Sequence, residues 1–214
     1  MMRYEYGDPA ASAVLIQPVE EQELAGLDRE IGEIRRLSDR SFSLIAVRIE
    51  DWNRELSPWA APAVFGKEGF GGGADGTLSE ILKLCADRRR AYILGGYSLA
   101  ALFALWAVFQ TDAFAAAAAA SPSVWFPGWM EHIKSRRPLT RRVYLSLGDK
   151  EEKTRNPVMA TVGDCIRETH EILKAGGADC VLEWNAGNHF KDPELRTARA
   201  FAWALNALGA QRPL

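Results

Sequence analysis

Short apolar runs alternate with longer stretches of helical period along the whole chain of 214 residues. The short runs have the length of strands, and alternation of this kind is typical of a parallel sheet covered by helices on both faces. We predict seven strands, at residues 3–6, 13–17, 42–49, 91–94, 114–120, 142–147 and 180–184. The expected fold is therefore α/β: a compact, mostly parallel, doubly wound sheet of about seven strands flanked by helices.

The segments between these strands predict the helices. Leu24, Leu27, Ile31 and Ile34 recur at helical spacing, with acidic residues before them and arginines after them, as suits a helix dipole. Thr77 and Glu80 form a capping-box pattern, which predicts the start of a second helix. Further helices are expected at residues 99–110, from near Pro157 to just before Gly176, and from Pro193 to Gly209.

Two segments have no clear periodicity, residues 51–76 and 121–138, and both are rich in Pro, Gly and Trp. Each follows a predicted strand, so both belong at the carboxyl edge of the sheet, where open α/β sheets bind their ligands. No inserted segment is long enough to form a lid.

The length and composition fit one domain that spans residues 1–214. Hydrophobic residues make up 48% of the chain, charged residues make up 25%, and the formal net charge is −2. The sequence has no concentrated basic face of the kind that binds nucleic acid, so we expect no nucleic-acid partner.

The sequence also predicts a protein that neither enters nor crosses a membrane. Glu5 and Asp8 stand where a signal peptide would carry its apolar stretch, and the alanine-rich run at 115–120 is too short to span a bilayer. We therefore expect a cytoplasmic location and no membrane partner. Odd in number and set in apolar patterns, the cysteines are expected to be buried thiols and not disulfides or metal ligands. They are Cys85, Cys165 and Cys180.

Ser98 lies at a sharp turn between a short apolar strand and a helix. A nucleophile elbow needs small residues two before and two after its nucleophile, because the strand and helix backbones cross closely there. Gly96 and Ala100 meet this need, with Ala at a position where Gly is usual. We therefore predict Ser98 as a catalytic nucleophile.

A serine hydroxyl becomes a good nucleophile only when a base takes its proton, and histidine is the usual base. His132 and His170 lie in predicted helices, where we expect structural roles. His189 lies between the last strand and the C-terminal helix, and it is the candidate base. The alternative is a loop histidine that caps Asp192 or meets solvent.

The third member of such a site is a carboxylate after the preceding strand, because the chain order in elbow enzymes is nucleophile, acid, base. An acid there fixes the tautomer of the imidazole and stabilises its charged form. Asp149, Glu151 and Glu152 all lie in this loop. Any of the three can instead be a solvated surface charge.

The oxyanion that forms during acyl transfer needs backbone N–H donors. One donor is expected from Leu99, the residue after the nucleophile. The second would follow the strand at 13–17, and because Pro18 has no N–H, we predict Val19. Trp52, at the end of the neighbouring strand, is the alternative donor.

Three segments together resemble an esterase family of the α/β-hydrolases that includes the siderophore (enterochelin) esterases. They are the elbow with its helix at 96–106, the next strand at 114–120, and the sequence Ser-Pro-Ser-Val-Trp at 121–125. Members of that family have a Gly-x-Ser-x-Gly-Gly-Leu-Phe elbow, a Ser-Pro-Ser-x-Trp segment, a Gly-x-x-Glu turn and a final histidine. The resemblance covers residues 91–190 and implies an α/β-hydrolase fold.

The resemblance also ranks the candidate acids. Gly148 and Glu151 match the Gly-x-x-Glu turn, so Glu151 comes first, Asp149 second and Glu152 third. Ala100 departs from the glycine of the family's elbow, as does the alanine that follows it. Tyr97 replaces a commoner histidine. We expect these departures to affect which substrate is bound more than the catalytic reaction itself.

The resulting prediction is a serine carboxylesterase that cleaves a small ester through an acyl-enzyme, without a cofactor or metal. The candidate substrate-binding residues are Trp52, Tyr97 and Trp125. Further aromatic residues line the pocket or form loop core: Trp59, Phe65, Phe70 and Phe126.

Two alternative functions stay open: a non-catalytic hydrolase fold that binds a small molecule or partner, and an acyltransferase that passes the acyl group to an acceptor other than water. The sequence does not name the ester and does not decide the oligomeric state, so a homodimer also stays open.

Overall fold

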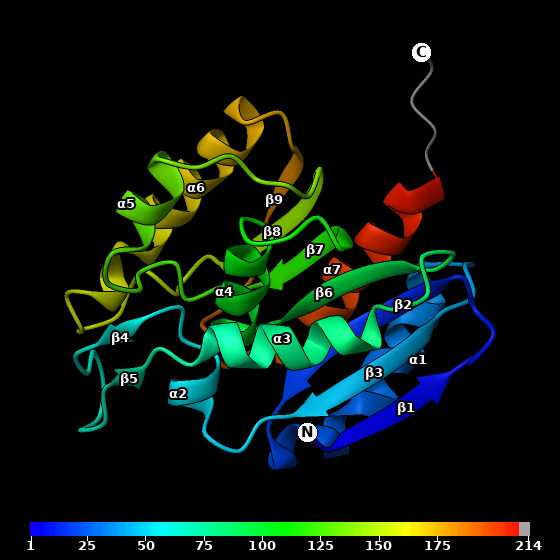
Figure 1. Ribbon diagram of the computed structural model, residues 1–214. Coiled ribbons are helices and arrows are strands. Elements are labelled where there is room, and N and C mark those ends of the chain that lie inside the picture. The colour runs from blue at the N-terminus through cyan, green and yellow to red at the C-terminus, as the bar shows by residue number, and fades with distance from the viewer. Residues whose placement is uncertain (210–214) are drawn as a thin grey trace.

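A seven-stranded sheet in the order β1-β3-β2-β6-β7-β8-β9 forms the centre of the computed structural model, which describes residues 1–209 (Figure 1). β1 runs antiparallel to β3, and the other neighbouring strands of this sheet pair in parallel. The strands are β1 (Arg3–Gly7), β2 (Ala13–Val19), β3 (Ser43–Arg48), β6 (Ala91–Tyr97), β7 (Phe114–Ala120), β8 (Arg142–Gly148) and β9 (Asp179–Asn185). The predicted α/β fold with a mostly parallel sheet is confirmed.

Each predicted strand is present, with ends within three residues of those expected. The largest difference is in β6, which continues through Gly95 and Gly96 to Tyr97 because β7 pairs with it as far as Ala120. Glycine has low strand propensity, so this extension could not be predicted from the residues. Gly95 is needed there, since a Cβ at that position would lie 2.6 Å from the backbone oxygen of Ala118.

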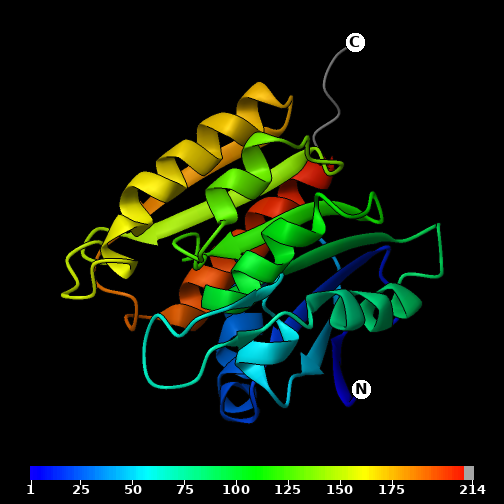
Figure 2. The same ribbon diagram turned by 60° about the vertical axis from the view of Figure 1, so that its left-hand side comes forward.

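Helices cover both faces of the sheet (Figures 1 and 2). α1 and α7 pack on one face, and α3, α4, α5 and α6 pack on the other. The helices are α1 (Leu27–Leu37), α2 (Trp52–Glu55), α3 (Ala74–Leu84), α4 (Ser98–Ala107), α5 (Trp129–Lys134), α6 (Val162–Ala175) and α7 (Pro193–Gly209), with 3₁₀ helices η1 (Glu21–Gly26) and η2 (Met159–Thr161). Within residues 1–209, no helix has the length and apolarity needed to cross a membrane.

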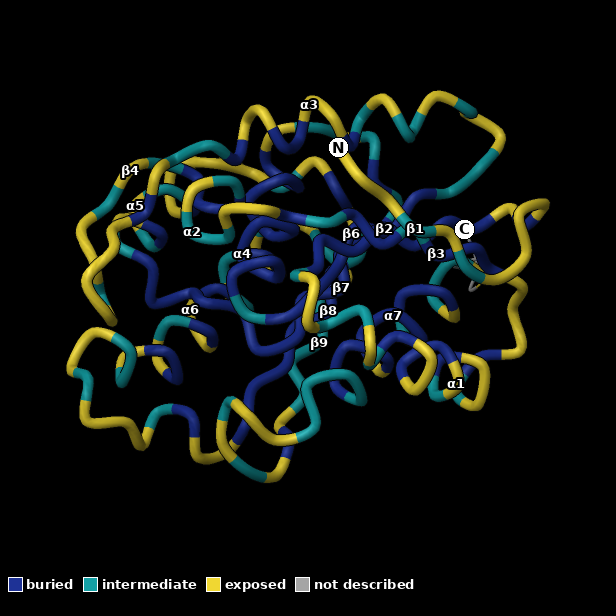
Figure 3. Tube along the Cα trace, turned by 90° about the horizontal axis from the view of Figure 1, so that it is seen from below, coloured by how far each residue is buried: buried dark blue, intermediate teal, exposed yellow. Residues whose placement is uncertain are grey.

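The alanine-rich strand β7 lies at the centre of both hydrophobic cores. Ala117 and Ala119 contact the core that contains α4, whereas Ala116 and Ala118 contact the core that contains α7. A strand covered on both faces has a continuous apolar sequence, and alanine lets both helices approach closely. The inner strands appear in Figure 3 as buried tube, with the exposed segments around the outside.

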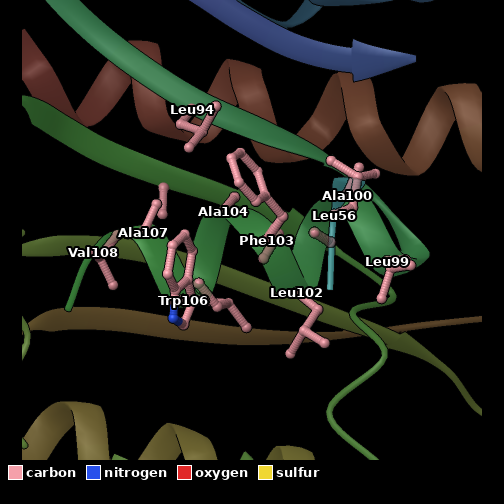
Figure 4. Packing of buried hydrophobic residues seen from close by; sticks show 14 of the residues in the cluster. Leu56, Leu94, Leu99, Ala100, Leu102, Phe103, Ala104, Trp106, Ala107 and Val108 are labelled. Atoms are coloured by element: carbon pink, nitrogen blue, oxygen red, sulfur yellow. The ribbon is translucent and has the colours of Figure 1, made fainter. Parts of the chain in front are cut away.

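α4 is buried on all sides, which explains its continuous apolar sequence. Residues 99–107 of this helix are all buried. Figure 4 shows Phe103 and Trp106 of α4 gathered with Leu94 of β6 and with Leu56. Because α4 begins at Ser98, this packing fixes the position of the predicted nucleophile.

The prediction that Thr77 and Glu80 cap a helix is wrong. α3 begins three residues earlier, at Ala74, and its preceding residue Gly73 donates to the Arg54 oxygen at 2.7 Å. The Thr77 hydroxyl instead donates to the Glu55 oxygen at 2.7 Å. A tertiary contact with α2 has therefore replaced the local cap.

The two segments without periodicity contain short elements, of which the sequence predicted the helix around His132 and not the others. Residues 51–76 form α2 and a two-stranded pair of β4 (Ala60–Ala61) with β5 (Phe70–Gly71), and residues 121–138 contain α5. Elements this short show no measurable period. The three cysteines are half-buried free thiols, so they are less buried than expected.

Candidate active site

Ser98 lies at the junction of β6 and α4 in a left-handed backbone conformation, with φ of 56°. A residue with a side chain is strained in this conformation, and such strain is found at functional sites. A Cβ added to Gly96 would lie 2.8 Å from the Cβ of Ala100. Because Gly96 carries no side chain, the elbow has room for alanine at position 100.

The side chains of Ser98, His189 and Glu151 form one continuous hydrogen-bonded chain. Ser98 Oγ lies 3.1 Å from His189 Nε2, and His189 Nδ1 lies 2.7 Å from Glu151 Oε2. The three residues follow β6, β9 and β8 at the carboxyl edge of the sheet, where parallel strands bring their ends together. A hydroxyl, an imidazole and a carboxylate in this order can activate the hydroxyl as a nucleophile.

Glu151 is buried and receives hydrogen bonds on both carboxylate oxygens. Its Oε1 accepts from the Gly148 N–H at 2.7 Å and from the Ser121 hydroxyl at 2.8 Å. Burial alone would raise the pKa of Glu151, but the hydrogen bond and charge of His189, and the hydrogen bonds of Gly148 and Ser121, lower it below its ordinary value. The carboxylate is therefore ionised at neutral pH.

The two other candidate acids have different partners. Asp149 Oδ1 accepts from the Gly187 N–H at 2.7 Å, which ties the loop after β8 to the loop after β9. Glu152 pairs with Arg167 at 3.3 Å in a more exposed position. Of the three carboxylates considered from the sequence, the one that contacts His189 is Glu151.

The two other histidines lie away from this chain of contacts. His132 is in α5, stacked on Trp129 with ring centroids 6.0 Å apart. Burial lowers the pKa of His132. His170 is in α6 beside Glu171 and the Cys180 carbonyl. Both positions agree with the structural roles expected from the sequence.

Three residues of the site were missed from the sequence. Ser123 Oγ lies 3.3 Å from Ser98 Oγ, and its N–H donates to the Ser98 carbonyl at 3.1 Å. Ser121 and Arg196 both contact Glu151. The Ser-Pro-Ser-x-Trp segment was a usable signal for the two serines, whereas Arg196 lies in a helix with no such signal.

The expected oxyanion donors differ in position. Leu99 is the second residue of α4, where backbone N–H groups have no partner within the helix. Val19 pairs with Arg48 in the β2–β3 ladder, and its carbonyl accepts from the Ile49 N–H at 2.9 Å. The N–H and C=O of one strand residue point to the same side, so the Val19 N–H faces β3 and not β6. This geometry argues against Val19 and leaves Trp52, at the start of α2, as the alternative.

The three predicted substrate-binding residues lie in different environments. Trp125 lines a small cavity of about 30 Å³ together with His189, Glu151 and residues that include Met159. Tyr97 is not free to bind a substrate through its hydroxyl, which donates to the His189 carbonyl at 2.7 Å. Trp52 is half-buried against the hydrophobic core.

The other aromatic candidates lie mostly in the loop core. Phe70 and Phe126 are buried and packed edge to face, with ring centroids 4.9 Å apart. Trp59 donates to the Pro127 carbonyl at 2.8 Å. Phe65 is 48% exposed and contacts the buried Trp125, so the aromatic cluster reaches the surface at Phe65.

No protein-family model matches the chain, and no curated protein matches it by sequence. Solved structures do match. The siderophore hydrolase EstA from Aspergillus nidulans is 21% identical over 94% of this chain and 85% of its own, with a TM-score of 0.69. An IroE-like serine hydrolase from Shewanella oneidensis is 14% identical over 98% of this chain and 77% of its own, with a TM-score of 0.74.

A third match is the enterobactin esterase FES from Shigella flexneri, 17% identical over 96% of this chain and 54% of its own, with a TM-score of 0.63. At such identities the likeness concerns the fold. The chain therefore has the α/β-hydrolase fold that the resemblance implied, in the form found in siderophore hydrolases and enterochelin esterases.

Proposed function

We propose that the protein is a serine esterase that cleaves a small carboxylic ester through an acyl-enzyme. The observation that carries this proposal is the chain of contacts from Ser98 Oγ through the imidazole of His189 to Glu151, at 3.1 and 2.7 Å. The strained backbone at Ser98 supports the same assignment, because an elbow exposes the nucleophile at the edge of the sheet.

In the proposed reaction, His189 Nε2 takes the proton of Ser98 as Oγ attacks the ester carbonyl carbon. The leaving alkoxide receives that proton, and an acyl group remains on Ser98. A water molecule then attacks the acyl carbon, His189 again takes and returns a proton, and the carboxylic acid leaves. Every step uses side chains of this chain and water.

The remaining roles follow from position. Glu151 accepts the Nδ1–H of His189 and so presents Nε2 as the base towards Ser98. The Leu99 N–H is one donor to the oxyanion, and the Trp52 N–H is proposed as the second. Trp125 and Phe65 are proposed to contact the acyl or alcohol group, because both belong to the aromatic cluster next to the His189 cavity.

The substrate class is proposed from the neighbours. EstA is named a siderophore hydrolase and FES an enterobactin esterase, so we propose siderophore esters for the first substrate panel, together with simple aryl and alkyl esters. The mechanism requires only that the ester carbonyl reach Ser98 Oγ beside His189.

Ester hydrolysis by wild-type protein, S98A and H189A tests the proposal. We expect the wild type to release acid and alcohol in equal amounts, S98A to be inactive and H189A nearly so. Turnover that requires an added alcohol or amine acceptor would identify an acyltransferase instead. Equal rates in the wild type and S98A would refute the assignment of the nucleophile.

A further inference from the structure

Arg196 is a buried cation at the centre of the site, and the proposed reaction has no step for it. It lies in the first turn of α7, and its side chain is 3% exposed. Charged side chains are almost never buried to this extent unless they are paired. The guanidinium of Arg196 makes five hydrogen bonds, so its burial is compensated.

Three of these bonds come from Nη1. It donates to Glu151 Oε1 at 2.8 Å, to the Tyr97 hydroxyl at 3.2 Å and to the Ser121 hydroxyl at 3.2 Å. Those partners follow or end three different strands, β8, β6 and β7. One side chain of α7 therefore joins the ends of the strands that carry the nucleophile and the acid.

The two other bonds hold the loop of the base. Nη2 donates to the Asn188 carbonyl at 2.9 Å and to the Ala186 carbonyl at 3.3 Å. The Tyr97 hydroxyl, itself bonded to Arg196, donates to the carbonyl of His189 at 2.7 Å. The backbone on the N-terminal side of His189 is thus fixed from one guanidinium, and the imidazole depends on that backbone for its position.

Glu151 contacts His189 and Arg196 through different carboxylate oxygens. Oε2 faces His189, and Oε1 faces the guanidinium of Arg196. Arginine is always charged in proteins. A permanent positive charge on the far oxygen weakens the attraction of Glu151 for a second positive charge on the imidazole, in a buried place where charges are poorly screened.

We propose that Arg196 is a positioning residue of the Ser98–His189–Glu151 site. It holds the loop before His189 in place, and its charge on Oε1 offsets part of the negative charge that Glu151 presents to the imidazole. This inference rests on the proposed esterase function.

The other charged groups around the site have partners other than Glu151. Asp149 accepts from the Gly187 N–H, and Asp192 and Glu194 both face Arg29 at 3.8 and 2.8 Å. Arg199, one turn further along α7, donates to Asn185 Oδ1 at 2.7 Å and is 45% exposed. Lys191 lies beside Gly187 in the same loop. Within residues 1–209, the permanently charged cation that meets Glu151 is Arg196.

Variants R196Q and R196K separate the two parts of the role, and R199Q is the matched control on the same helix. The assay is the pH profile of kcat and kcat/KM on a small aryl ester, with rates corrected for the folded fraction. R196K keeps the charge near Glu151, but a lysine cannot reach all five acceptors. R196Q removes the charge as well.

For R196Q we expect kcat to fall by about tenfold to a hundredfold with KM little changed, because the imidazole loses its alignment. The acid limb of its kcat/KM profile moves up by about one pH unit, because an unshared Glu151 charge favours the protonated imidazole. R196K recovers part of the rate and keeps the wild-type acid limb. R199Q stays within about twofold of the wild type, as expected for an exposed pair.

An R196Q variant that is folded, with kcat and acid limb equal to those of the wild type, would overturn the proposal. If R196Q does not fold, R196K decides, and an undiminished kcat in R196K would overturn the positioning role. Titration of the His189 imidazole by NMR in R196Q and wild type tests the charge effect without turnover. If the wild type neither hydrolyses esters nor reacts at Ser98 with a serine-directed fluorophosphonate, the proposed function fails. The NMR comparison then still tests the effect of the Arg196 charge on His189.

Discussion

Glu30 gives a stability prediction that is independent of the active site. This carboxyl is in α1, 3% exposed, and its Oε2 accepts from the Gln17 side chain at 3.3 Å. Its Oε1, like the Gln17 Oε1, is buried without a hydrogen-bond partner among the described residues. Burial raises the pKa of Glu30 from 4.5 to about 8.

The sign of the effect follows from proton binding. Between pH 4.5 and about 8 the folded protein keeps a proton on Glu30 that the unfolded chain has released, so stability falls as the pH rises through this window and levels off above it. At about 1.4 kcal/mol per pH unit, the full difference is on the order of 5 kcal/mol. Because the effective dielectric constant around buried groups is higher than that of dry protein, we expect a smaller observed loss of a few kcal/mol.

E30Q keeps the shape of the side chain and cannot ionise. We expect the free energy of unfolding of E30Q to equal that of the wild type within about 1 kcal/mol at pH 5.5, and to exceed it by about 2 to 4 kcal/mol at pH 8.5. Urea denaturation followed by tryptophan fluorescence at both pH values measures the difference. E33Q is the control, because a hydrogen bond from Arg36 lowers the pKa of Glu33, so this group stays ionised throughout. A wild type and E30Q that lose stability in parallel would refute the reasoning.

Two further pairs of substitutions test the site. E151Q should lower kcat/KM by about 10³ to 10⁴, because Gly148, Ser121 and Arg196 all donate to Oε1 and force the amide NH₂ towards His189 Nδ1, which selects the wrong tautomer of the imidazole. D149N should lower kcat/KM by less than about threefold, since an amide oxygen still accepts from the Gly187 N–H. Equal losses of ester turnover in the two variants would reject Glu151 as the acid. G96A should destabilise the protein by about 1 to 3 kcal/mol, because its Cβ would lie 2.8 Å from that of Ala100. Adding A100G should recover part of that loss in thermal unfolding, and strictly additive effects would contradict the proposed packing of the elbow.

Much of the fold was predictable because its signals are local and repeated. The inner strands are largely apolar runs, and β7 is recognisable as an alanine run covered by two helices. The elbow was predictable for the same reason, since Gly96 and Ala100 are required by one close backbone crossing. These features depend on residues that are near one another in the sequence.

What could not be predicted depends on contacts between distant segments. Arg196 is in a helix whose neighbours include exposed charges, and its burial results from acceptors supplied by the ends of several strands and one loop. Val19 was chosen by counting strands, but the direction of its N–H depends on the pairing of β2 with β3. Thr77 has the pattern of a cap, yet a contact with Glu55 takes its hydroxyl.

The most direct test of the central claim is labelling of the native protein with a fluorophosphonate, followed by mass mapping of the modified peptide. Heat-unfolded protein and H189A are the controls, because an unactivated serine reacts slowly with such probes. We predict that the native wild type is labelled at Ser98 and that both controls are not. A folded wild type that stays unlabelled, or that is labelled elsewhere, would contradict the proposal that Ser98, His189 and Glu151 form a catalytic site.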